Sequence, residues 1–257
     1  MFEPRPLPDD VAAVRDEHAP EAVVLDVDTD VETIAPAAAE DLGLFVDRLD
    51  PASYPDDWLP ADAPTVLRRY AGSDFTVGMP GDGTVGWTRQ TDPPVVLVKA
   101  RASGTPDDFL AFLLAEALVQ VGTGAPEQFL PFFGARYRDL DGAIPLSPTG
   151  VYQIAAALYD GWLGLQTRDV YADWDGRLFD AWLDAGERLE PRLTDLPGAV
   201  ARGETAFADA TELACSGIKH ALDLPAPFAA LDTSAYVEYG AEYAVKWARK
   251  TFERLQE

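Results

Sequence analysis

Acidic side chains outnumber basic ones by 44 to 20, which leaves the 257-residue chain with a formal net charge of −24. Like charges at this density repel one another and oppose a compact state in dilute buffer. Molar salt shortens the Debye length to about 3 Å and removes most of that repulsion. The basic residues are mainly Arg, because Lys occurs only at Lys99, Lys219, Lys246 and Lys250. The charge therefore predicts a fold that needs concentrated salt.

The acids are spread along the chain instead of gathered in blocks. Asp9-Asp10, Asp56-Asp57 and Asp107-Asp108 are pairs, and no run reaches five acids. Displacing counterions from phosphates requires clustered cations, so nucleic acid is not an expected partner. This excess of Asp with few Lys resembles the proteins of salt-in halophilic archaea, and the chain is similar to an uncharacterised, halophile-adapted haloarchaeal family. The resemblance implies a halophilic, soluble protein.

Composition favours one folded protein with a sizeable core. Hydrophobic residues make up 47% of the chain, and a chain of this length buries roughly 70–75% of its unfolded surface. The N-terminus shows no basic segment leading into an apolar one, and no apolar run reaches the roughly 18 residues of a membrane span. We therefore expect a cytoplasmic protein without a membrane partner. The single cysteine, Cys215, excludes disulfides within the chain and thiolate zinc sites.

A small antiparallel sheet is predicted within residues 1–104. Strands at 75–79 and 84–89 flank a turn at 80–83 that contains two glycines, and the nearly all-apolar stretch 94–99 supplies a third strand. Together these strands predict a meander.

Helices in the same part are expected near 9–17, 36–49 and 64–71. The stretch 22–34 stays open between two interpretations. Val24, Val27, Val31 and Ile34 recur at helical spacing, whereas the apolar run that begins at Val23 suits a strand.

Residues 105–257 are predicted to be a helical bundle. Thr105 at the N-cap, Pro106 at the first helical position and Asp108 at the third form a capping box, which predicts a helix over 109–121. Further helices are expected at about 126–137, 149–166, 171–190, 198–222 and 233–255. The whole chain, residues 1–257, is predicted to be one α+β domain.

Four polar residues on two otherwise apolar helices are the candidate catalytic residues. Glu116 and Gln120 are four apart, and Gln153 and Asp160 are seven apart, so each pair shares one face of its helix. If the two faces meet, a carboxylate would lie in a dry core, where its pKa rises and it can serve as general acid or base. The alternative is that these groups satisfy one another and have only a structural role.

The order of elements around Glu116 resembles the core of zincin metallopeptidases. In that family a short sheet ends in an apolar strand and is followed by a buried helix that carries His-Glu-x-x-His. The segment Ala115-Glu116-Ala117-Leu118-Val119 keeps only the Glu. Because both ligand histidines are missing, the resemblance implies a zincin-like core that binds no zinc. We expect neither a metal nor a cofactor.

Two further patterns offer weaker signals. Asp26, Asp28 and Asp30 follow an apolar run, which resembles the nucleophile loop of haloacid-dehalogenase-like phosphatases and the first part of a calcium loop. The Thr of the first family and the Gly and Glu of the second are absent, so a solvated acidic surface is the preferred interpretation.

Glu212, Ser216 and His220 are spaced four apart on one predicted helix. Adjacent turns of a single helix rarely give a catalytic triad its geometry, so the stripe indicates a structural role.

An aromatic stripe lies on the last predicted helix and consists of Tyr236, Tyr239, Tyr243 and Trp247. Packing in the core or at an interface explains it better than stacking on bases.

The sequence favours a non-catalytic binding or interaction module whose partner is a protein or small molecule, with a homo-oligomer possible. The alternative is a metal-independent hydrolase that uses buried carboxylates near Glu116 and Asp160.

Overall fold

The computed structural model describes residues 2–30, 33–34, 36–72, 75–76 and 83–256. The chain divides into two compact units. Unit 1 comprises Met1–Asp56, Thr65–Glu127 and Trp174–Ala181, and unit 2 comprises Asp57–Pro64, Gln128–Asp173 and Trp182–Glu257. The backbone therefore passes between the units five times, at 56/57, 64/65, 127/128, 173/174 and 181/182. The single-domain expectation stays a prediction.

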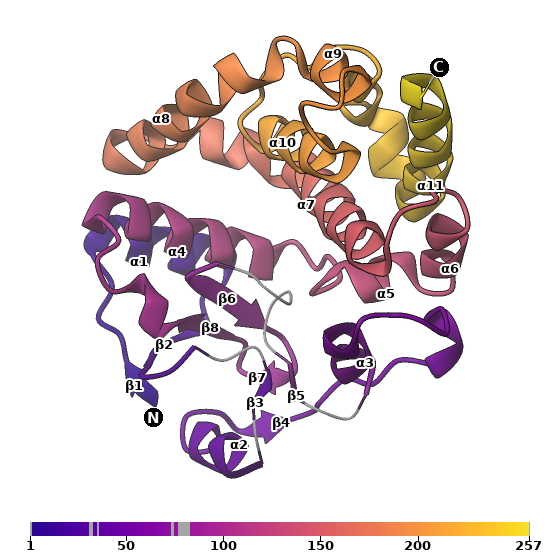
Figure 1. Ribbon diagram of the computed structural model, residues 1–257. Coiled ribbons are helices and arrows are strands. Elements are labelled where there is room, and N and C mark those ends of the chain that lie inside the picture. Colours follow the sequence, from indigo (N-terminus) through magenta and orange to yellow (C-terminus); the bar gives the residue numbers. More distant parts are fainter. Residues whose placement is uncertain (1, 31–32, 35, 73–74, 77–82, 257) are drawn as a thin grey trace. The chain divides into compact units, whose positions relative to one another are not determined.

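Unit 1 holds the strands and four of the α-helices, which Figure 1 labels. In chain order these elements are β1 (Phe2–Pro4), α1 (Asp9–His18), β2 (Val23–Val27), β3 (Thr33–Ile34), α2 (Pro36–Leu42), β4 (Arg48–Leu49), α3 (Thr65–Ala71), β5 (Phe75–Thr76), β6 (Val85–Thr88), β7 (Thr91–Asp92), β8 (Val95–Val98), the short 3-10 helix η2 (Ala100–Ala102) and α4 (Asp107–Gly122). A further 3-10 turn, η1 (Asp56–Trp58), lies where the chain first leaves unit 1.

The main sheet has the strand order β1-β2-β8-β6 and is mixed. Strands β2 and β8 run parallel, with Val23 opposite Val95, whereas β1 and β6 are antiparallel to their neighbours. The predicted pairing of 84–89 with 94–99 is confirmed by β6 and β8. The sheet is not wholly antiparallel as expected, because β2 inserts beside β8.

Both faces of this sheet are covered, which explains why β8 is apolar throughout. Val95 and Leu97 belong to a core cluster that also holds Ala38 and Leu42 of α2. Successive side chains alternate between the faces, so Val96 points the other way, toward the side where α4 contacts β6 and β8 and packs against α1. Figure 1 shows α1 and α4 along one face of the sheet.

Three predictions for the N-terminal part differ from the structure or had been left open. Within the undecided stretch 22–34, Val23–Val27 form β2 and Thr33–Ile34 form β3. The helix expected at 36–49 ends at Leu42, and β4 follows it. The predicted strand 75–79 is described only as β5, which pairs with β3. Most of its predicted partner turn, 80–82, lies outside the described residues.

Helix α4 begins one residue later than the capping box predicts. Pro106 is the N-cap and makes no side-chain cap, so Thr105 does not cap this helix. Asp107 and Asp108 still lie in the first turn, where negative charge favours the helix dipole. At the other end, a side chain on Gly122 would clash with the backbone carbonyl of His18. The close approach of α1 to α4 thus requires glycine.

Unit 2 is helical, apart from its connecting segments. Its helices are α5 (Phe129–Phe133), α6 (Arg136–Asp141), α7 (Pro148–Ala172), α9 (Leu196–Ala201), α10 (Phe207–Lys219), the short η3 (Phe228–Leu231) and α11 (Ser234–Gln256), and it shares α8 (Gly176–Leu193) with unit 1. The long α7 packs along α10. A Cβ on Gly161 would lie 2.9 Å from Cys215 Sγ, so small residues let these two helices approach closely.

Two expected helices are divided in the structure. The helix predicted at 126–137 becomes α5 and α6, separated by Gly134 with φ +54°. The helix predicted at 198–222 becomes α9 and α10. The remaining bundle follows the expected order, and the predicted α+β class is confirmed.

Candidate functional site

A polar network in unit 1 is centred on Glu127, in the segment that follows α4. Its Oε2 accepts hydrogen bonds from Thr88 Oγ1 at 3.0 Å and from the backbone N of Arg89 at 3.1 Å. Its Oε1 accepts from Gln90 Nε2 at 2.8 Å. Both carboxyl oxygens are therefore engaged by the end of β6 and the turn that leads to β7.

The same turn is tied to a third stretch of chain. Gln90 Oε1 accepts from the backbone N of Ala52 at 2.8 Å, and the backbone O of Gln90 accepts from the backbone N of Asp50 at 2.7 Å. Thr88 is 0% exposed and Gln90 is 7% exposed. Three segments far apart in sequence, around residues 51, 89 and 127, thus meet through buried polar groups.

Helix α4 joins this network through Trp87. The indole Nε1 of Trp87 donates to Gln120 Oε1 at 2.8 Å, and Gln120 Nε2 donates to Glu116 Oε1 at 3.2 Å. The Arg89 guanidinium lies 5.4 Å from the centre of the Trp87 ring and donates to the backbone O of Ala125. The structure therefore brings together two of the candidates, Glu116 and Gln120. We call Trp87, Thr88, Arg89, Gln90, Glu116, Gln120 and Glu127 the Glu127 network.

Burial sets the chemistry of Glu127. Loss of hydration raises its pKa from 4.5 to about 7, although the hydrogen bonds from Arg89 N, Gln90 and Thr88 and the charge of Arg89 act in the opposite direction. A carboxyl group with a pKa near neutrality exchanges its proton in the physiological range, which is the property required of a general base or of a pH-sensitive contact.

The other two candidates lie on α7 in unit 2. Gln153 Nε2 donates to Asp209 Oδ1 and to Glu212 Oε2, each at 2.9 Å. Asp160 is exposed, so the dry surroundings expected for it were wrong. Glu116 belongs to unit 1 and the α7 pair to unit 2, and an approach of Glu116 to Gln153 or Asp160 stays a prediction.

His220 and Cys215 are held in their uncharged forms. Burial and the nearby charge of Lys219 lower the pKa of His220 to about 4, and its ring lies 5.9 Å from that of Trp182. Burial, reinforced by the charge of Asp160, raises the pKa of the Cys215 thiol. Neither group is an activated base or nucleophile at neutral pH.

Asp26 in β2 and Asp30 after it are paired with arginines. Asp26 Oδ1 lies 2.5 Å from Arg5 Nη1, and Asp30 Oδ1 lies 3.2 Å from Arg101 Nε. The backbone N of Arg101 also donates to Asp30, which lowers the pKa of that carboxyl. In the part of the chain that the structure describes, no group of three or more His, Cys, Asp or Glu could hold a metal ion.

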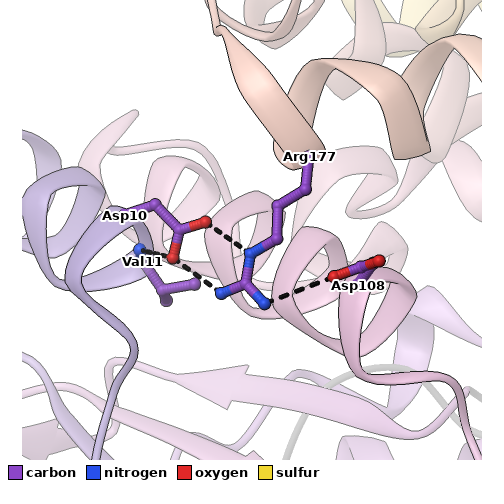
Figure 2. A network of polar contacts seen from close by, with 4 residues as sticks. All are labelled: Asp10, Val11, Asp108 and Arg177. Atoms are coloured by element: carbon purple, nitrogen blue, oxygen red, sulfur yellow. Dashed lines mark hydrogen bonds and ion pairs between the residues drawn. The ribbon is translucent and has the colours of Figure 1, made fainter.

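A second polar cluster in unit 1 is built around Arg177, which Figure 2 shows between Asp10 and Asp108. The guanidinium donates from Nε and Nη2 to the two oxygens of Asp10, at 2.6 and 2.8 Å, and from Nη1 to Asp108 Oδ1 at 3.3 Å. The hydrogen bonds from Arg177 lower the pKa of Asp10. We call these three residues the Arg177 cluster. It fixes the start of α8 to α1 and α4.

A family model described as a family of unknown function, DUF7089, matches residues 1–255. The chain belongs to this family. No curated protein and no solved structure matches it. These comparisons show no link to the zincins or to halophilic archaea. Among the described residues, no helix of this DUF7089 member combines the length and apolarity needed to cross a membrane.

Sequence reasoning missed Glu127, the central residue of the network. Its surroundings come from residues near 51 and 89, so no local spacing pointed to it. The only local signal was its position in Gly122-Thr123-Gly124-Ala125-Pro126-Glu127, a connecting segment otherwise free of charge. An acid is rarely buried unless it is paired, so this position alone did not indicate that Glu127 loses hydration.

Proposed function

We propose that this protein is a non-catalytic binding or interaction module adapted to concentrated salt. One observation supports it above all: the side chains that could do chemistry are engaged by groups of their own unit. The side-chain amide of Gln120 accepts one hydrogen bond through its oxygen and donates another through its nitrogen. Both oxygens of Glu127 accept hydrogen bonds, and the amide nitrogen of Gln153 donates to two carboxylates. A catalytic group needs an atom that reaches the substrate.

An aromatic surface on unit 2 is the proposed contact region. Tyr239 is 56% exposed and Val237 is 40% exposed, immediately before Gly240, where the backbone of α11 leaves helical geometry. Trp162 Nε1 donates to the backbone O of Val237 at 3.2 Å, and the Trp162 ring lies 4.8 Å from that of Phe132. We call the exposed Val237 and Tyr239, together with the half-buried Phe132 and Trp162 that lie against Gly240, the aromatic surface.

Concentrated salt favours recognition through such a surface. Salt screens contacts between exposed charges, whereas the attraction between apolar groups persists. Exposed apolar and aromatic side chains that gather on one region commonly mark interaction sites. The remaining members of the aromatic stripe serve the interior: the hydroxyls of Tyr236 and Tyr243 donate to the backbone O of Leu158 and Ala230.

Affinity purification from the source cells in molar KCl tests the proposal. The double variant Val237→Ser with Tyr239→Ser should lose a stoichiometric partner that the unchanged protein retains. Leu44→Ser is the matched control, because Leu44 is an apolar residue of unit 1 that is 82% exposed. Equal recovery of the partner with all three proteins would contradict the role of the aromatic surface.

A hydrolase assay tests the enzymatic alternative. The unchanged protein should show no turnover of activated esters, phosphates or glycosides above that of Glu116→Gln. Turnover that disappears in Glu116→Gln and in Asp160→Asn would instead support the metal-independent hydrolase.

A further inference from the structure

Three segments of unit 1 meet at the Glu127 carboxyl group. Thr88, Arg89 N and Gln90 donate to it, and Gln90 in turn holds the segment of Ala52. Glu127 is also the last residue of this part of unit 1, directly before the chain enters unit 2 at Gln128. We propose that Glu127 is a proton-sensitive contact that holds the segment between α4 and α5 against the β6–β7 turn and loosens when the carboxyl group ionises.

The charges around Glu127 leave its ionised form poorly compensated. Arg89 is the charged group that acts on it. The Arg89 guanidinium, however, donates to the backbone O of Ala125 and lies over Trp87, so Arg89 reaches the carboxyl group through its backbone N. The other acid of the network, Glu116, is connected through Gln120 and Trp87. The groups that donate directly to the Glu127 carboxyl group are a hydroxyl, a backbone N–H and a side-chain amide, and none of these three carries a charge.

The hydrogen bonds can accommodate the proton. Thr88 Oγ1 donates to Glu127 Oε2 and accepts from the backbone N of Gln90. When Glu127 is protonated, its hydroxyl group can donate to Thr88 Oγ1, since a threonine hydroxyl is both donor and acceptor. The contact therefore persists in the neutral form without moving any heavy atom.

The direction of the effect follows from linkage. In the closed contact the pKa of Glu127 is about 7, whereas a carboxyl group turned out into solvent returns to 4.5. Ionisation favours the state with the lower pKa, so the open state gains population as pH rises from about 4.5 to about 7 and gains no more above that pH. The full difference corresponds to an increase of up to about 300-fold in the opening equilibrium.

Hydrogen exchange measured by mass spectrometry tests this at constant molar KCl. Peptides that cover residues 86–92 and 121–128 are followed between about pH 5 and 9, with rates corrected for the intrinsic pH dependence of exchange. In the unchanged protein, opening should increase from about pH 5 and level off above about pH 7 in both peptides. Glu127→Gln keeps the shape and removes the titration, so its opening should not depend on pH.

Glu116→Gln is the matched control, because it removes an acid of the same network and leaves Glu127 in place. Loss of the pH dependence in Glu116→Gln but not in Glu127→Gln would overturn the proposal. Opening that is constant or decreases between about pH 5 and 7 in the unchanged protein would overturn it as well.

Infrared difference spectroscopy of the unchanged protein provides a test that needs no variant. A protonated carboxyl band that disappears with a midpoint near 7 is the expected result. A spectrum in which every carboxyl group has ionised below about pH 5 would contradict the proposal.

Discussion

The Glu127 network and the Arg177 cluster both hold acids of unit 1, yet they handle negative charge in opposite ways. At the Arg177 cluster a guanidinium faces two carboxylates near the surface, and the pKa of Asp10 is lowered. In the Glu127 network burial dominates and the pKa is raised to about 7. An acid that a guanidinium contacts directly stays ionised at every physiological pH, whereas an acid whose carboxyl group loses hydration among neutral donors becomes titratable.

The comparison shows how a very acidic chain can still respond to protons. With 44 acids in the sequence, almost any exposed carboxylate is ionised at neutral pH. A proton-sensitive group therefore has to be removed from water and kept away from a direct guanidinium contact. The Glu127 carboxyl group meets both conditions, whereas Asp10 is in direct contact with Arg177.

The largest expected effect concerns the whole chain and its charge of −24. Circular dichroism should show the folded fraction increasing from dilute buffer toward about 1–2 M KCl, where the screening length approaches contact distance. Full folding with an unchanged melting temperature across that range would remove the argument for salt adaptation.

The next largest effect is the pH dependence contributed by Glu127. Its pKa is raised on folding, so its contribution to stability is fully present below about pH 4.5 and is lost as pH rises through about 7. Relative to Glu127→Gln, the free energy of unfolding of the unchanged protein should decrease by about 3 kcal/mol over this range. Denaturant titrations at several pH values measure it. Parallel curves for the two proteins would show that Glu127 has an ordinary pKa.

Replacing Glu116 by Leu tests whether its carboxylate is structural. The change leaves Gln120 Nε2 without the acceptor that lies at 3.2 Å, so it should cost about 1–3 kcal/mol of stability and leave partner binding unaffected. Adding Gln153→Leu or Asp160→Ala measures the predicted approach to α7 as a double-mutant cycle. Additive effects would show that Glu116 on α4 does not interact with Gln153 or Asp160 on α7.

The smallest effect is expected at the Arg177 cluster. Arg177→Gln should cost about 1 kcal/mol in the lowest salt that keeps the protein folded and less at higher salt, because the pair is partly exposed. Arg192→Gln, an exposed arginine on the same helix, is the control.

The pH dependence of this loss distinguishes the cluster from Glu127. Asp10 has a lowered pKa, so its contribution is present above about pH 3.8 and disappears as pH falls through the folded-state value. A loss that grows on going from neutral to alkaline pH would contradict that sign.

Local patterns in the sequence were sufficient for much of the fold. The apolar helix that carries Glu116 and Gln120, the long helix with Gly161, and the buried strand around Val96 were all predicted from periodicity and composition. These elements could be predicted because the spacing of apolar residues within a short stretch indicates both the type of element and the face that it buries. The i, i+4 relation likewise placed Glu116 beside Gln120.

Tertiary structure alone decided the rest. The parallel pairing of β2 with β8 joins strands about 70 residues apart, with Val23 opposite Val95. Because the connection between them is so long, the local sequence of either strand does not indicate its partner. The chemistry of Glu127 depends on donors from the β6–β7 turn, 37 to 39 positions away. The residues beside it, Pro126 and Gln128, carry no charge, so only the folded chain takes its carboxyl group out of water and raises its pKa.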